Sequence, residues 1–336
     1  HIVSITMLNT LSTGEDPKKI LQTIRDLDIA ENIIIWFTDN DNKQFISQGK
    51  NNGKNIDLNT YIDIASITKP IINILWLLEL KKHSIKISHN VWDFLWYLNW
   101  FNIKIEDLLT HTHGITIKKE FRFDKTKNYS IDEFKNILED KNHLEKTNPS
   151  YSNLSNLFFG QIIEKISWKN LDILLKDFVN KHNLKWLVYN PMKNLDSHES
   201  ILPTSPTWTT WIVHDPIARY YWWVTGCAGI FANMDWLISF GLSWLQNKFE
   251  FEEKFFDKQN FGYEAWKFWL VWKFSEYDRE ILKFTWHTWT IFLLNPQKRK
   301  ILITFCNLTY RDTAQYMERR ERYRDLERTF IKILKS

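Results

Sequence analysis

A serine and a lysine three residues apart are the pair in this sequence best placed to do chemistry. Ser66 and Lys69 stand at the start of a long apolar run that ends at Leu80, which predicts a buried helix. Residues three apart on a helix share a face, so the Lys69 amine can accept the proton of the Ser66 hydroxyl. Pro70 fits only the first turn of that helix, which places Ser66 at the helix start. There the backbone N–H of Ser66 can also stabilise an oxyanion.

Three segments further along the chain carry polar side chains that could complete such a site. Residues 108–115 read LLTHTHGI, residues 151–153 read YSN, and residues 286–290 read WHTWT. The Ser-x-x-Lys pattern alone is a weak signal, because an exposed serine and lysine often share the first turn of a helix. The signal becomes specific through the order of all four segments.

In sequence and order, these segments resemble the landmarks of penicillin-recognising serine hydrolases, the family of class C β-lactamases with their esterase and D-peptidase relatives. The resemblance spans about residues 30–334. It implies an α+β fold, with an antiparallel sheet flanked by helices and a helical lobe beside the active site. It also implies a serine acyl-enzyme that acts on an ester, amide or lactam carbonyl without a metal or organic cofactor. The partner would be a small-molecule or peptide substrate, with peptidoglycan fragments among the candidates.

The resemblance assigns a role to each matching residue. Ser66 corresponds to the nucleophile, Lys69 to its base, and Tyr151 to the group that passes a proton to the leaving group. The other matching residues would bind the substrate or its oxyanion: Asn153 through its amide, His287 in place of the lysine of Lys-Thr-Gly, Thr288 beside it, and Thr290 through its N–H.

The tryptophan content is abnormal. The chain has 9 glycines and 18 tryptophans, whereas about 7% glycine, on the order of 24 residues, is ordinary for this length. We interpret this as a gene that reads UGA as glycine but was translated with UGA as tryptophan. The alternative is a genuinely tryptophan-rich protein with an obstructed cleft. The tryptophans that stand where the family pattern or a local turn prefers glycine are Trp168, Trp222, Trp223, Trp286 and Trp289.

Two histidine groupings have simpler interpretations. His111 and His113 lack a third ligand at a suitable spacing, so we interpret them as loop histidines rather than a metal site. His113 also replaces a serine of the family pattern. His214 and Asp215 are adjacent and point in different directions, so a structural role is favoured over a catalytic triad. The rival function is a catalytically silent protein that binds cell-wall peptides, which Trp289 would favour.

The elements that must position these residues follow from the hydrophobic pattern. A hairpin is predicted over residues 32–49, and strands return near the C-terminus, so both ends should complete one sheet. We expect an α/β lobe of about residues 20–80 and 235–336, and a mostly helical lobe of about residues 81–234, with loops at 201–234. The predicted elements are helices at 66–80, 103–114, 154–166, 170–179, 235–246 and 313–334, and strands at 264–275, 280–285, 289–294 and 300–307.

Composition excludes several classes of protein. The net charge of +4 comes from 44 basic and 40 acidic residues spread along the chain, which argues against a nucleic-acid partner. No apolar run approaches the roughly 20 residues of a membrane-spanning helix. Cys227 and Cys306 show no metal-ligand spacing, and a disulfide between them stays open. The first residues show no signal-peptide pattern, so the sequence assigns no compartment.

Overall fold

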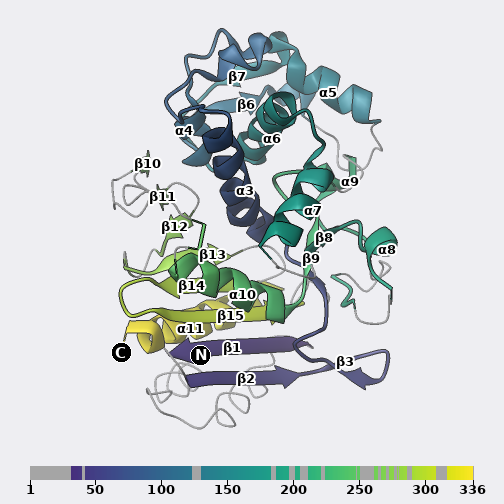
Figure 1. The fold of residues 1–336 in the computed structure, drawn as a ribbon, viewed down its shortest axis with the longest axis vertical. Coiled ribbons are helices and arrows are strands. Elements are labelled where there is room, and N and C mark those ends of the chain that lie inside the picture. The colour runs from purple at the N-terminus through teal and green to yellow at the C-terminus, as the bar shows by residue number, and fades with distance from the viewer. Residues whose placement is uncertain are drawn as a thin grey trace.

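The computed structural model describes residues 32–39, 42–122, 130–182, 187–196, 201–204, 211–220, 224–246, 248–249, 261–263, 266–269, 272–275, 278, 280–285, 290–307 and 316–335. Its largest element is an eight-stranded antiparallel sheet (Figure 1). In spatial order its strands are β10 (Phe261–Tyr263), β11 (Trp266–Trp269), β12 (Trp272–Phe274), β13 (Leu282–Thr285), β14 (Ile291–Asn295), β15 (Lys300–Cys306), β1 (Ile33–Asp39) and β2 (Asn42–Gln48).

The sheet joins the two ends of the chain. Strand β1 pairs with β2 in the predicted hairpin and with β15 on its other edge, from Ile33 opposite Cys306 to Asp39 opposite Lys300. Both cysteines are buried free thiols, so the disulfide left open by the sequence does not form. The antiparallel sheet with flanking helices and the completion of the sheet by both ends are confirmed.

Alternating side chains give the sheet two apolar faces. In β1, Ile34 and Trp36 point into the main core, where α10 (Met234–Leu245) packs. Ile33 and Ile35 point the other way, into a second core covered by α11 (Tyr316–Lys335). This period of two is what a strand buried on both faces requires. The sheet therefore lies between two helical layers.

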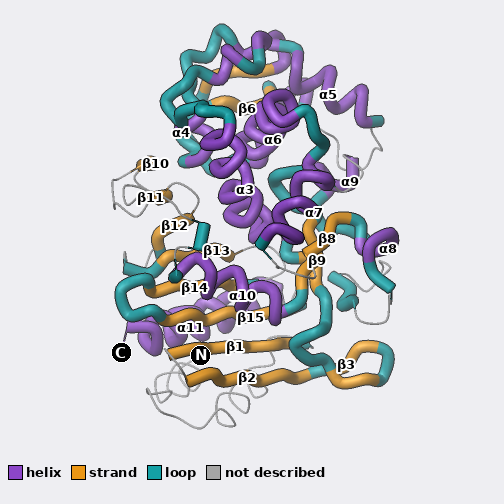
Figure 2. The backbone as a smooth tube through the Cα atoms, viewed as in Figure 1, coloured by secondary structure: helices purple, strands orange, loops and turns teal. Residues whose placement is uncertain are grey.

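A second group of helices forms the lobe drawn above the sheet in Figures 1 and 2. Helix α3 (Thr68–Lys82) reaches from this lobe towards the sheet, is buried along most of its length, and contacts α6 (Asn153–Ser167) and α7 (Leu171–Lys181). A helix that is apolar on all sides belongs in a protein interior. The helices of this lobe are α3 (Thr68–Lys82), α4 (Ile105–Leu109), α5 (Ile131–Glu139), α6 (Asn153–Ser167) and α7 (Leu171–Lys181).

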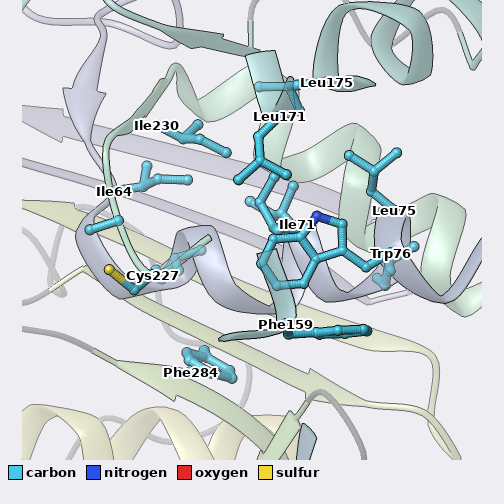
Figure 3. Close-up of a cluster of buried hydrophobic side chains, with 14 of the residues drawn as sticks. Ile64, Ile71, Leu75, Trp76, Phe159, Leu171, Leu175, Cys227, Ile230 and Phe284 are labelled. Atoms are coloured by element: carbon cyan, nitrogen blue, oxygen red, sulfur yellow. The ribbon is translucent and has the colours of Figure 1, made fainter. Parts of the chain in front are cut away.

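Trp76 lies at the centre of the contact between α3 and α6. Its ring meets Phe159 edge to face, with 4.7 Å between ring centroids (Figure 3). Glycines shape the space around it: a Cβ at Gly226 would overlap the indole, and one at Gly160 would lie 3.5 Å from it. At Gly226 the backbone can approach the indole this closely only without a side chain.

Residues 201–234, predicted as loops, contain two short elements. Strand β9 (Ile230–Ala232) lies between β5 (Ile62–Asp63) and β8 (Leu187–Tyr189), and α9 spans Pro216–Tyr220. The loop prediction was wrong for these elements, because a three-residue strand is too short to show a periodic pattern. No described helix is long and apolar enough to cross a membrane. The remaining strands and α-helix are β3 (Lys50–Asn51), β4 (Lys54–Asn55), β6 (Ile115–Ile117), β7 (Leu144–Lys146) and α8 (Pro191–Asn194).

Candidate active site

Ser66 lies in a tight turn between strand β5 and helix α3. This turn is a single 3-10 helix, η1 (Ala65–Ile67), that runs directly into α3. Ala65 adopts the left-handed conformation, with φ at +45°, which is costly for a residue that carries a Cβ. Strain of this kind next to a reactive side chain is common at functional sites.

A buried carboxylate holds that turn in place. Asp63 Oδ1 accepts the Ala65 N–H at 2.8 Å, and Oδ2 accepts the His214 N–H at 2.7 Å. Burial is the largest influence on this carboxyl and raises its pKa to about 6. These two hydrogen bonds fix the backbone that directs Ser66, a role that the sequence reading missed. The only signal in the sequence is an aspartate three residues before the serine.

The structure brings Ser66 and Lys69 together as their spacing on one helix face requires. Lys69 Nζ lies 2.6 Å from Ser66 Oγ and donates to the Cys227 carbonyl oxygen at 2.9 Å. Both side chains are fully buried. The Cys227 carbonyl therefore orients the amine towards the hydroxyl. Sequence reasoning could not find this group, because every residue of the chain carries the same backbone carbonyl.

Tyr151 and Asn153 flank Ser152, the residue that caps the start of α6. The Lys69 amine sits over the Tyr151 ring, with Nζ 5.2 Å from the ring centroid. The Ser152 hydroxyl caps α6 by accepting the Leu154 N–H at 3.1 Å, which fixes the residues on either side of it. Asn153 Nδ2 donates to an oxygen of Asp215 at 3.3 Å.

His214 and Asp215 support the site through hydrogen bonds to backbone N–H groups. The His214 N–H binds Asp63, as described above, and Asp215 Oδ1 accepts the Ala218 N–H at 3.0 Å. The other Asp215 oxygen accepts from Asn153. This arrangement matches the structural role expected from the sequence rather than a Ser-His-Asp triad.

The strand that borders the site is described only in part. His287, Thr288, Trp286 and Trp289 lie outside the described residues. Thr290 is fully buried and directly precedes β14, which pairs with β13. Strand β13, the neighbour of β14, contacts η1, the turn that carries Ser66.

Two buried histidines next to Tyr151, His111 and His113, also belong to the site. The rings of His111 and Tyr151 lie 4.6 Å apart, and the Ser155 hydroxyl lies within hydrogen-bond distance of both His111 and His113. The sequence reading treated both as loop histidines. Within the described ranges, no group of three or more His, Cys, Asp or Glu side chains is placed to hold a metal ion.

The match to known families agrees with this geometry. The β-lactamase family model covers residues 34–322 of the chain. The chain belongs to the β-lactamase family. No curated protein matches it in sequence.

Several solved structures of the β-lactamase fold superpose on nearly the whole chain. EstCE1, described as a hydrolase with promiscuous acyltransferase activity, has a TM-score of 0.67 at 12% identity and covers 96% of this chain and 99% of its own. A simvastatin synthase mutant from Aspergillus terreus has a TM-score of 0.70 at 12% identity, over 95% and 98%. A class C β-lactamase from Rhodobacter sphaeroides has a TM-score of 0.63 at 15% identity, over 93% and 98%. At these identities the likeness establishes the fold.

Proposed function

We propose that this chain is a serine hydrolase that forms an acyl-enzyme on Ser66 with an ester, amide or lactam carbonyl. The observation that carries the proposal is the 2.6 Å contact between Lys69 Nζ and Ser66 Oγ at the start of a buried helix. A serine hydroxyl is a weak nucleophile unless a base stands within hydrogen-bond distance. Lys69 is the base in this site, and the Cys227 carbonyl fixes its position.

The reaction divides into acylation and deacylation. As Ser66 Oγ bonds to the carbonyl carbon, its proton passes to the Lys69 amine and the carbonyl oxygen becomes negative. The N–H groups of Ser66 and Thr290 are the proposed donors to that oxyanion. The bond to the leaving group then breaks, and the leaving group takes a proton through Lys69 and Tyr151. Water then attacks the carbonyl carbon of the acyl-enzyme and gives a proton to Lys69; the bond from that carbon to Ser66 Oγ breaks, the acid leaves, and the proton returns from Lys69 to Ser66 Oγ.

The structural neighbours support more than one substrate class. One is named as a hydrolase with promiscuous acyltransferase activity, and another as a class C β-lactamase. We therefore propose ester and lactam carbonyls together, with amides of D-amino-acid peptides as the third class. A panel of p-nitrophenyl esters, nitrocefin and D-Ala-D-Ala peptides ranks them by kcat/KM.

Labelling with a fluorophosphonate and with a fluorescent penicillin tests the nucleophile directly. We expect an adduct on the peptide that contains Ser66, located by mass spectrometry, and no adduct in Ser66→Ala. Ser239→Ala is the matched control, because Ser239 is a partly buried serine on α10 whose hydroxyl donates to the Asp235 carbonyl of its own helix. An adduct that persists in Ser66→Ala would reject Ser66 as the nucleophile.

The second candidate function is a silent protein that binds cell-wall peptides. The full burial of Ser66 and Lys69 favours it, because a nucleophile without solvent access cannot reach a substrate in this conformation. The outcome that supports this candidate is saturable binding of a D-Ala-D-Ala peptide by calorimetry, with neither probe forming an adduct. An adduct on Ser66 would support the serine hydrolase over the silent binding protein.

A further inference from the structure

Three buried side chains form a continuous line of hydrogen bonds behind Tyr151. His113 Nε2 lies 2.9 Å from Ser155 Oγ, and Ser155 Oγ lies 2.7 Å from His111 Nδ1. Each of the three residues is at most 2% exposed. The line joins the segment after α4 to the first turn of α6, the helix that Tyr151 precedes.

The direction of the first bond follows from a backbone donor. The Ile115 N–H points at His113 Nδ1 at 3.0 Å, and an amide N–H can only donate. His113 Nδ1 is therefore an acceptor. Burial lowers the pKa of His113 to about 3, so the ring is neutral and its proton resides on Nε2. That N–H donates to Ser155.

The second bond runs the same way. The Ser155 hydroxyl accepts from His113, so its single hydrogen is available to His111 Nδ1. The Ser152 N–H also approaches His111 Nδ1, at 3.4 Å, which independently makes this nitrogen an acceptor. Burial first, and then the Lys69 charge, lower the pKa of His111 well below its ordinary value. His111 is thus a neutral ring with its proton on Nε2.

The His111 ring packs directly against Tyr151, the residue proposed to pass a proton to the leaving group. The ring centroids of His111 and Tyr151 are 4.6 Å apart with 42° between the planes, and the Lys69 amine lies over the same Tyr151 ring. A neutral His111 places no positive charge of its own beside the amine, and a fixed tautomer gives Tyr151 one packing surface.

We propose that His113, Ser155 and His111 form a one-directional hydrogen-bond chain that fixes the tautomer of His111 and thereby positions Tyr151 for proton transfer. The positioning role depends on the proposed hydrolase function. His113, the residue that departs from the family's serine, is then the origin of the chain. None of the three residues is assigned contact with the substrate, so they are positioning residues.

Histidine NMR tests the chain without any need for activity. In protein labelled with 15N-histidine, long-range 1H–15N spectra show which ring nitrogen carries the proton, and His111→Asn and His113→Asn assign the two signals. We expect both rings to remain neutral with the proton on Nε2 from pH 5 to 8. A proton on Nδ1 of either ring, or titration of His111 in this range, overturns the inference.

Kinetics test the positioning role. Ser155→Ala should lower kcat on the best p-nitrophenyl ester about tenfold with KM changed less than about twofold, and Ser155→Thr, which keeps a hydroxyl, should restore most of kcat. Ser243→Ala removes another largely buried serine, on α10, and should leave kcat unchanged. An unchanged kcat in Ser155→Ala also overturns the inference. If the wild-type protein turns over no substrate, the proposed function fails, and the NMR result alone decides whether the chain exists.

Discussion

Trp168 occupies a backbone position that suits glycine, and we predict that Trp168→Gly stabilises the protein. The residue ends α6 in the left-handed conformation, at φ +58° and ψ +27°, and its N–H binds the Glu164 carbonyl. Glycine is the usual residue at this place after a helix, because it has no Cβ to clash. A glycine there keeps the same N–H and the same hydrogen bond.

The size of the effect follows from three contributions. The left-handed conformation costs a non-glycine residue roughly 1–2 kcal/mol. Relief of this cost is offset by about 0.4–1 kcal/mol, because glycine makes the unfolded chain more flexible and so favours unfolding. The indole is 91% exposed, so its removal loses little burial. The net gain is about 0.5–1 kcal/mol, which for a chain of this length shifts Tm by only about 1 °C.

Denaturant unfolding resolves a change of this size better than thermal unfolding does. Trp96→Gly is the matched control, because Trp96 is 74% exposed but lies in a 3-10 helix and is not among the residues with positive φ. Glycine there should cost about 0.5–1 kcal/mol. Opposite signs for the two variants are expected, and a loss of stability in Trp168→Gly comparable to the control would refute the reasoning.

Three further predictions concern the site and its supports. Ser66→Ala should abolish acylation, and Lys69→Ala or Tyr151→Phe should lower its rate by orders of magnitude with the circular dichroism spectrum unchanged; near-full activity in Ser66→Ala would exclude the nucleophile. Gly114→Ala should lower the free energy of unfolding by about 2 kcal/mol or more, measured in urea, because φ is +58° and a Cβ would lie 2.5 Å from a carbonyl oxygen. Burial raises the pKa of Asp63 from 3.8 to about 6, so between these pH values the folded state holds a proton on Asp63 that the unfolded state has lost. The contribution of Asp63 to the free energy of unfolding therefore falls by about 3 kcal/mol as pH rises from about 4 to 6. Urea unfolding of wild type and Asp63→Asn across that range measures it, and a constant difference between the two contradicts it.

The sequence predicted those parts of the site that depend on spacing within one element. Ser66 and Lys69 meet because a helix places residues three apart on one face. The hairpin of β1 and β2 and the strands near the C-terminus follow from apolar runs bounded by polar turns. Short-range periodicity is enough for these elements, since each is long enough to show it.

The supports of the site depend on contacts between distant segments, which no local pattern encodes. The Cys227 carbonyl that holds Lys69 lies 158 residues away in sequence. Asp63 reaches the His214 backbone across 151 residues. The His111–Ser155 bond spans 44 residues and joins a loop to a helix. Both histidines were noted in the sequence, but only the three-dimensional structure shows that Ser155 connects them by hydrogen bonds.

Two of the described tryptophans, Trp168 and Trp76, lie in opposite surroundings, and the difference makes the UGA hypothesis testable residue by residue. Trp168 is exposed in a left-handed position, as a misread glycine would be. Trp76 is fully buried against Phe159, and its neighbour Gly226 leaves room for the indole alone. A glycine at position 76 would leave a large cavity, and loss of a buried aromatic side chain costs about 3–5 kcal/mol.

We therefore predict that peptides of the protein purified from its native host contain glycine at positions 168, 286 and 289 and tryptophan at position 76. Peptide mass spectrometry decides each position, because exchange of tryptophan for glycine changes the fragment mass. Tryptophan at 168 and 289 would contradict the UGA hypothesis, and an indole at 289 would then favour the silent binding protein. Glycine at 289 would match the residue that the family pattern has at this position, and would remove the main sequence-based argument against a serine hydrolase.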